Sequence, residues 1–328
     1  MPANRCKGML EKLLQDKENN CNKAQDVNEQ RKELLKPFDN KQHIQKSSQA
    51  IKPSKPVQKL KSILKENHGT VHKAVQEHFP EIVNYLVDKQ EQLQFDHSYM
   101  KNKEGINTRM RAILVDWLID VAAKFRMAFQ TIFLTIHFLD QYCQNSDVDK
   151  SEYQLLGIAC ILVASKTEEV YPPHTSRYTQ ICDHAFTLPQ ILEMEQKVLQ
   201  VLNFEVHPPT MISLLETINC ELKLERIHLC YALYILENSL LELSIFKSNY
   251  FTIVRGALYL VSKIYNLNSL EEKMLNHNSI QPEGVRNCAK DLYLVLKRNE
   301  KIPLKASSRK FSSEDLCEVS KYRLEKNQ

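Results

Sequence analysis

The most constraining feature of this 328-residue chain is a stretch that is apolar on nearly every helical face. It reads MRAILVDWLIDVAA from Met110 to Ala123, and its only charges are Arg111, Asp116 and Asp120. A helix without a polar side must be enclosed by other helices. The stretch therefore predicts the central helix of a helical bundle. Because an unpaired buried charge is costly, Arg111 needs an anionic partner inside that bundle.

The rest of the chain also favours helices over strands. Apolar residues recur at helical spacing from about Val71 onward, and β-branched alternation is rare. Two segments about a hundred residues apart are similar, GIACILVASK from Gly157 and GALYLVSKIY from Gly256, which weakly indicates a repeated helical domain. Further helices are expected over residues 131–144, 150–166 and 189–202.

Charge divides the chain into two parts. Residues 1–70 hold 15 Lys and Arg against 8 Asp and Glu, and their one aromatic residue is Phe38. Such a segment cannot bury enough apolar surface to offset its chain entropy, so we expect a disordered basic tail. The tail lacks the arginine clusters and interleaved aromatic residues that favour nucleic-acid binding, and nucleic acid is therefore not an expected partner.

Composition and motifs argue against an enzyme. The chain has 6 glycines and contains no GxxxxGK[ST], GxGxxG, HRD, HExxH or G-x-S-x-G motif. Its 9 cysteines include no C-x-x-C pair, and Cys160 lies in an apolar run without a nearby His, as an inert thiol does. We therefore expect neither a cofactor nor a metal.

Location follows from two further absences in the sequence. No run of about 18 uncharged apolar residues occurs, so we expect no membrane span and no membrane partner. The N-terminal residues MPANRCKGMLEKLL lack the apolar core of a signal peptide. The expectation is an intracellular protein of the nucleus, the cytoplasm or both.

Three segments together resemble a cyclin of the mitotic A/B class. They are MRAILVDWL at 110–118, LVASKTEEVYPP at 162–173 and MEQKVLQVLNFEVHPPT at 194–210. Their mutual spacing also fits that family, and the similarity runs from about Phe79 to Lys321, more weakly in the second half. The resemblance implies an all-α fold, with two tandem five-helix cyclin-box domains preceded by the disordered tail. The implied segments are an N-terminal helix region at 71–105, the N-terminal cyclin box at 106–206, the C-terminal cyclin domain at 207–300 and a C-terminal extension at 301–328.

The resemblance implies a regulatory, activating subunit of a cyclin-dependent protein kinase in G2 and mitosis, with no chemistry of its own. One alternative is a cyclin-fold scaffold or transcription-associated cyclin whose abundance does not follow the cell cycle. Another is a nucleic-acid-associated protein with two cyclin-fold repeats, but Cys6 and Cys21 do not supply the paired cysteines of its zinc ribbon.

By the resemblance, Lys166 and Glu195 bind the kinase backbone, because an ammonium donates to main-chain carbonyls and a carboxylate accepts from main-chain N–H groups. Ile82 and Tyr85, on a helix ahead of the first box, would add contacts. A hollow for an apolar kinase side chain would be lined by Val163, Thr167, Leu199, Phe204 and Val206. The family usually has an aromatic residue at Thr167, so a shallower and more polar hollow is expected. From the residues alone, the alternative is ordinary surface charges and core packing.

The resemblance also implies a substrate-docking patch for Arg-x-Leu-type peptides, and a structural ion pair between Arg111 and Asp140. The patch would consist of Met110, Ile113, Leu114, Trp117, Asp120, Lys150 and Gln154. Its apolar members share one helical stripe, which from the residues alone is more often core. Asp120 replaces the family's usual Glu and Lys150 replaces a common Arg, so a shifted substrate preference is expected.

Short segments of the tail resemble the KEN and destruction boxes by which a ubiquitin ligase of mitotic exit recognises mitotic cyclins. They are Lys17-Glu18-Asn19, Lys65-Glu66-Asn67 and the R-x-x-L segment from Arg31 to Leu34. Because the tail is rich in Lys, Glu and Asn, the alternative explanation is a chance match. A lysine-rich extended segment is nevertheless what ubiquitin transfer requires.

Overall fold

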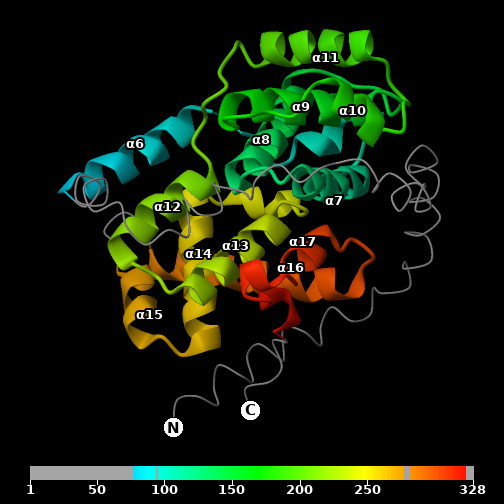
Figure 1. Cartoon of the computed structure of the whole chain (residues 1–328). Helices are drawn as coiled ribbons and strands as arrows, with labels where there is room; N and C mark the ends of the chain where they lie inside the picture. The colour runs from blue at the N-terminus through cyan, green and yellow to red at the C-terminus, as the bar shows by residue number, and fades with distance from the viewer. Residues whose placement is uncertain (1–76, 94, 277–280, 323–328) are drawn as a thin grey trace. The chain divides into compact units, whose positions relative to one another are not determined.

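The computed structural model describes residues 77–93, 95–276 and 281–322, and all the regular structure in these ranges is helical (Figure 1). The expected disordered tail at 1–70 and the candidate degradation signals within it lie outside the described residues. The all-α fold with two five-helix domains is confirmed. No helix among the described residues is long and apolar enough to cross a membrane.

The helices fall into two successive groups of five, with short elements on either side. The first group is α7 (Thr108–Phe125), α8 (Phe129–Asn145), α9 (Tyr153–Glu168), α10 (Ser176–Ile181) and α11 (Leu188–Val201). The second group is α12 (Met211–Leu222), α13 (Arg226–Ser239), α14 (Tyr250–Tyr265), α15 (Asn268–Leu275) and α16 (Pro282–Lys301). The flanking and connecting elements are α6 (Phe79–Gln92), η3 (Tyr99–Asn102), η4 (Leu243–Lys247), α17 (Ala306–Lys310), η5 (Glu314–Leu316) and η6 (Val319–Lys321).

Helices α8 and α9 form the enclosed centre of the first domain. Every residue from Thr131 to Cys143 and from Tyr153 to Ser165 is buried, and α9 packs against α7, α8 and α11. This corrects the expectation that 110–123 is the central helix. Helix α7 keeps a partly exposed side. It packs against α8, α9 and, from the C-terminal part of the chain, α17.

Local signals define the ends of α7. The Asn107 side chain accepts hydrogen bonds from the backbone N–H groups of Arg109 and Met110, at 3.1 and 3.0 Å. An asparagine at this position satisfies N–H groups that have no partner within the helix. Arg126 ends the helix in the left-handed conformation, with φ of 55°, a position that more often holds glycine.

The third helix of each domain is approached closely at a glycine. A Cβ on Gly157 of α9 would lie 3.1 Å from Cδ1 of Leu114 in α7. A Cβ on Gly256 of α14 would lie 3.2 Å from Sγ of Cys288 and from the backbone N of Ala289 in α16. The two similar segments of the sequence are therefore corresponding helices, which need a small residue for the same reason.

A buried ion pair joins the two domains. Arg111 Nε and Nη2 donate to Asp140 Oδ1 and Oδ2 at 2.6 and 2.7 Å, and Arg111 Nη1 donates to the Leu240 carbonyl, just after α13, at 2.8 Å. Tyr99 of η3 donates its hydroxyl to Asp140 Oδ1 at 2.8 Å. Burial would lower the pKa of Arg111, but the adjacent Asp140 carboxylate outweighs burial and raises that pKa. The guanidinium is thus held charged in the interior.

We predict that Arg111→Ala lowers the free energy of unfolding by about 3–5 kcal/mol, because it leaves the Asp140 carboxylate buried without its partner. The matched control is Arg286→Ala, which removes an exposed arginine 3.8 Å from Glu283 and should cost less than about 1 kcal/mol. Urea unfolding followed by circular dichroism measures both. Equal losses in the two variants would contradict the role given to the buried pair.

A small cavity of about 20 Å³ lies between the two domains, beside this ion pair. It is lined by Phe95, Phe133, Ile136, His137, Asp140, Thr210, Met211, Leu240, Phe246 and Tyr250. Burial lowers the pKa of His137 to about 4, and the nearby Asp140 opposes that shift only in part. The imidazole is therefore neutral in the folded chain at neutral pH.

We predict that this histidine makes the fold less stable in mild acid. An unfolded histidine takes up a proton near pH 6.5, whereas His137 in the folded chain does so only near pH 4. Stability is therefore complete above the unfolded value and decreases as the pH falls toward 4, by roughly 2 kcal/mol at pH 5. Urea unfolding of wild type and His137→Leu at pH 7.5 and pH 5 isolates the contribution. The same pH dependence in both proteins would refute it.

Candidate functional site

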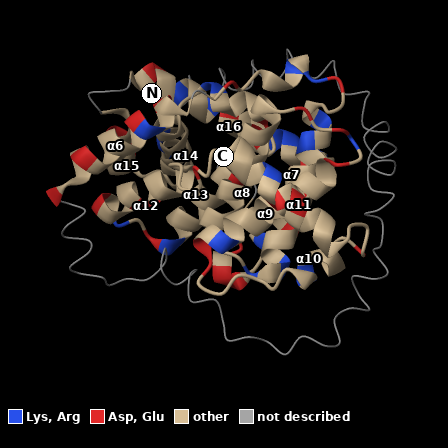
Figure 2. Cartoon of the chain, turned by 90° about the horizontal axis from the view of Figure 1, so that it is seen from above, with Lys and Arg blue, Asp and Glu red and all other residues tan. Residues whose placement is uncertain are grey.

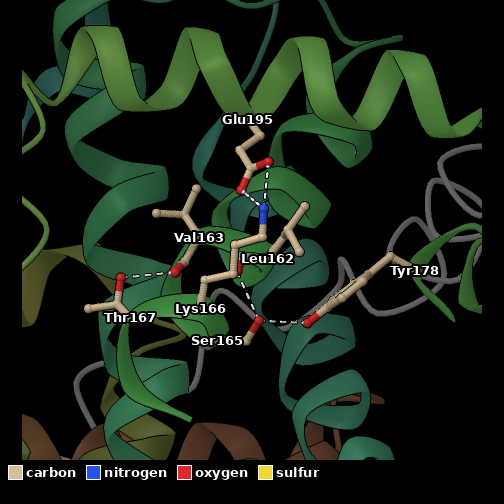
Figure 3. Close-up of polar contacts among 7 residues, drawn as sticks. All are labelled: Leu162, Val163, Ser165, Lys166, Thr167, Tyr178 and Glu195. Carbon is tan, nitrogen blue, oxygen red and sulfur yellow. Dashed lines mark hydrogen bonds and ion pairs between the residues drawn. The ribbon is translucent and has the colours of Figure 1, made fainter. Parts of the chain in front are cut away.

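Lys166 and Glu195 meet where the end of α9 passes the middle of α11. Lys166 Nζ lies 2.6 Å from Glu195 Oε1 and 2.8 Å from Oε2 (Figure 3). The Lys166 side chain is 45% exposed and that of Glu195 is 11% exposed. The carboxylate is therefore held at the rim of the packed interface, while the ammonium reaches solvent.

The start of α11 sets the register that brings Glu195 to this rim. Thr187 and Gln190 form a capping box, with Pro189 in the first turn, a combination that begins a helix sharply. Glu195 follows Ile191 by four residues, so both point toward α9 on the buried stripe of α11. A carboxylate on such a stripe requires a cation nearby, and Lys166 supplies it.

The pair keeps hydrogen-bonding capacity for a partner. An ammonium has three donors, and a carboxylate has about four acceptor positions. The two contacts between Lys166 and Glu195 use part of this capacity. A main-chain carbonyl and a main-chain N–H group of another protein could bind beside each other here through charge-assisted hydrogen bonds.

The residues predicted to line the hollow lie on α9, on α11 and in the segment that follows α11. Val163 is buried, whereas Thr167, Leu199 and Val206 are half-buried. The Thr167 hydroxyl donates to the Val163 carbonyl at 3.0 Å (Figure 3). Because this hydroxyl is already hydrogen-bonded within α9, Thr167 would add less polarity to the predicted hollow than a free hydroxyl group would.

Phe204 is the most exposed residue of the predicted hollow, at 67%. It follows Asn203, and both have left-handed backbones, with φ of 59° and 49°. A bulky residue in this region of φ and ψ is strained. The turn after α11 therefore holds a large aromatic ring out in solvent, an arrangement that suits contact with a partner.

Ile82 and Tyr85 lie on α6, which packs against α12 and α14 of the second domain (Figure 1). Val83 is the buried residue of this helix, whereas Ile82 is half-buried and Tyr85 is 60% exposed. If this face served only to pack on the bundle, Tyr85 would be buried, and it is not.

The proposed docking patch is only partly open. Its residues lie on α7, in the turn before α9 and on α9, which packs against α7. Met110, Ile113, Leu114 and Gln154 are buried. The accessible members are Trp117 and Asp120, which are half-buried, and Lys150, which is exposed. Asp120 forms an ion pair with Arg309 of α17, a contact that the sequence did not predict.

A further contact that the sequence did not predict supports the end of α9. The Ser165 hydroxyl is 2.8 Å from the Tyr178 hydroxyl of α10 and donates to the Leu162 carbonyl (Figure 3). Helix α10 spans six residues, with no apolar periodicity by which to find it. Tyr178 thus fixes the turn that carries Lys166.

Two buried thiols, Cys160 and Cys182, are poor nucleophiles. Burial raises the pKa of Cys160 well above its usual value and raises that of Cys182 to about 12. The cysteines in the described ranges are free thiols. No group of three or more His, Cys, Asp or Glu within those ranges could hold a metal ion.

Lysines, arginines and acidic residues are interspersed over the described helices (Figure 2).

Two family profiles match consecutive parts of the chain. The profile described as "Cyclin, N-terminal domain" matches residues 81–207, and "Cyclin, C-terminal domain" matches residues 209–324. The chain belongs to the cyclin family. Its curated relatives include cyclins of both the A and the B type, which makes it a cyclin of the A/B type.

Several curated cyclins are similar to this cyclin over most of its length. G2/mitotic-specific cyclin-B of Spisula solidissima is 30% identical over 75% of this chain and 58% of its own length. Cyclin-A1-4 of Oryza sativa subsp. japonica is 31% identical over 67% of this chain and 64% of its own. Human cyclin-A2 is 29% identical over 70% of this chain and 54% of its own. The chain thus spans between about half and two thirds of these relatives.

A solved structure agrees with the fold. The X-ray structure of a viral cyclin from herpesvirus saimiri matches with a TM-score of 0.57 and 21% sequence identity, over 64% of this chain and 96% of that chain. At this identity the match supports the fold of the two helical domains and nothing beyond it.

We predict that Lys166→Ala lowers the free energy of unfolding by about 1–2 kcal/mol. The lysine end of the pair reaches solvent, where ion pairs contribute little to stability, but the change leaves the mostly buried Glu195 carboxylate without its cation. The control is Lys197→Ala on α11, whose side chain is 46% exposed and pairs with Glu193 at 3.2 Å. Urea unfolding measures both. A loss of several kcal/mol for Lys166→Ala alone would make Lys166 a structural residue rather than a binding residue.

Proposed function

We propose that this cyclin is the activating regulatory subunit of a cyclin-dependent protein kinase and acts in G2 and mitosis. The observation that carries the proposal is the Lys166–Glu195 pair, which reaches solvent next to the half-buried Thr167. The names of similar proteins, among them G2/mitotic-specific cyclins of the A and B types, support the cell-cycle assignment.

The proposed mechanism is allosteric and requires no catalytic group on the cyclin. Lys166 and Glu195 bind kinase main chain, and the hollow receives an apolar kinase side chain. Tyr85 and Phe204, both exposed, extend the contact to either side. An interface of about 2,000 Å² or more, as in permanent signalling complexes, would bind the active kinase conformation in preference to others and so raise its population.

Two accessory functions complete the proposal. The patch around Trp117, Asp120 and Lys150 docks Arg-x-Leu-type peptides of kinase substrates or inhibitors. A ubiquitin ligase of mitotic exit recognises a degradation signal in residues 1–70, with Lys17-Glu18-Asn19 the first candidate. Both functions would act inside the cell, in the nucleus, the cytoplasm or both.

We predict that Lys166→Ala weakens kinase binding by ~2 kcal/mol or more, because it removes the ammonium and leaves Glu195 partly buried at the interface. Lys197→Ala, which removes a lysine of similar exposure from the adjacent helix, should bind as wild type does. The measurement is titration against a panel of cyclin-dependent kinases, with phosphorylation of a histone-type substrate as the activity readout. Unchanged activation by Lys166→Ala would overturn the proposed contact.

Protein abundance in synchronised cells separates this proposal from its alternative. A mitotic cyclin should accumulate before division and disappear at mitotic exit. Constant abundance would favour a scaffold or transcription-associated cyclin instead. Stabilisation by Lys17→Ala, with Lys23→Ala as the matched lysine control, would support the first degradation signal.

A further inference from the structure

Asp120 of the proposed docking patch is held by the chain's own C-terminal segment. Nη2 of Arg309, in α17, forms an ion pair with Asp120 Oδ2 in α7. Both side chains remain partly exposed, at 54% for Arg309 and 43% for Asp120. An arginine and a carboxylate that both reach solvent can exchange partners with a molecule that binds there.

The residues around Arg309 keep it in this position. The Ala306 backbone N–H donates to Asp116 Oδ1 of α7 at 2.9 Å. On the other side, Lys310 pairs with the buried carboxylate of Glu237 in α13, and its Nζ lies 4.1 Å from the centre of the Phe129 ring in α8. Helix α17 is thus fastened to both domains at the residues that flank Arg309.

The Arg309 side chain carries the same guanidinium group as the arginine of the proposed peptide ligand. A docking peptide that presents a guanidinium to Asp120 must share or displace the guanidinium of Arg309. Aspartate is shorter than the glutamate usual in the family, so its carboxylate is less able to bind the guanidinium groups of Arg309 and of a peptide at the same time. A peptide without a cation at that position meets no such competition.

We propose that Arg309 is an intramolecular competitor that weakens docking of arginine-containing peptides at Asp120. The inference rests on the docking patch proposed above. Arg309 thereby shifts the selectivity of the patch toward the apolar part of a peptide. Because solvent-exposed ion pairs contribute little free energy, the competition amounts to about a two- to five-fold change in affinity.

Trp117 gives a direct readout, because it is the only tryptophan of the chain and belongs to the patch. Two tryptophan-free peptides are titrated against the full chain, one with arginine two residues before leucine and one with neutral citrulline in place of that arginine. The proteins are wild type, Arg309→Gln, and the control Arg298→Gln, which removes a partly exposed arginine that pairs with Glu242 instead of Asp120. Thermal unfolding of each protein verifies that it is folded.

Arg309→Gln should bind the arginine peptide about two- to five-fold more tightly than wild type and bind the citrulline peptide equally well. Arg298→Gln should match wild type for both. In an Asp120→Asn background, Arg309→Gln should no longer change the affinity. This last arm tests that the competition acts through the Asp120 carboxylate.

Equal affinity of wild type and Arg309→Gln for the arginine peptide would overturn the inference and leave the docking patch standing. Equal tightening for both peptides would also overturn it, because the effect would then not depend on the guanidinium. If none of the proteins binds either peptide, the docking patch itself is refuted, and the competition with it.

Discussion

The buried pair of Arg111 and Asp140 is the interaction on which the arrangement of this cyclin depends. An arginine in the middle of an apolar helix is tolerated only with its charge compensated and its donors used. Asp140 of α8 compensates the charge, the Leu240 carbonyl of the second domain takes a further donor, and Tyr99 binds the same carboxylate. One guanidinium therefore links α7, α8 and the second domain, and its geometry fixes how these parts meet.

That arrangement explains why the residues proposed to bind a kinase gather at one end of α9. The helix is enclosed as far as Ser165, so its accessible side chains begin with Lys166 in the last turn. Helix α11 lies along α9 and brings Glu195 to the same place. A packed interior thus presents a charged pair beside the residues of the proposed hollow, and the proposed binding would require little reordering of the pair. Preorganisation of this kind lowers the entropic cost of association.

Much of this could be predicted from the sequence, because the strongest signals were local. Periodicity found α7, α8, α9 and α11 to within a few residues, and the isolated charge of Arg111 implied a buried partner. Family motifs supplied the residues of the candidate site. The start of α9 was expected three residues too early because Lys150 to Glu152 form a turn ahead of the helix.

The remaining features depend on contacts between distant parts of the chain. Helix α7 was expected at the centre because it is apolar on nearly every face. Its sequence does not reveal that one of these faces is covered by α17 and not by another helix of the first domain. The pairing of Asp120 with Arg309 joins residues 189 positions apart, and no local sequence pattern around either residue predicts it. The left-handed backbone of Phe204 is likewise set by the turn after α11 and not by residue type, since aromatic residues rarely adopt it.

Hydrogen exchange of the backbone, measured for the cyclin alone and with an activated cyclin-dependent kinase, tests the central claim most directly. The account predicts slower exchange of peptides that contain the end of α9, the second half of α11 and the turn at Phe204, together with α6. Peptides of α15, in the second domain and outside the proposed interface, should exchange at the same rate in both samples. Slower exchange confined to α15 and α16, or none at all, would contradict the claim that this face binds the kinase.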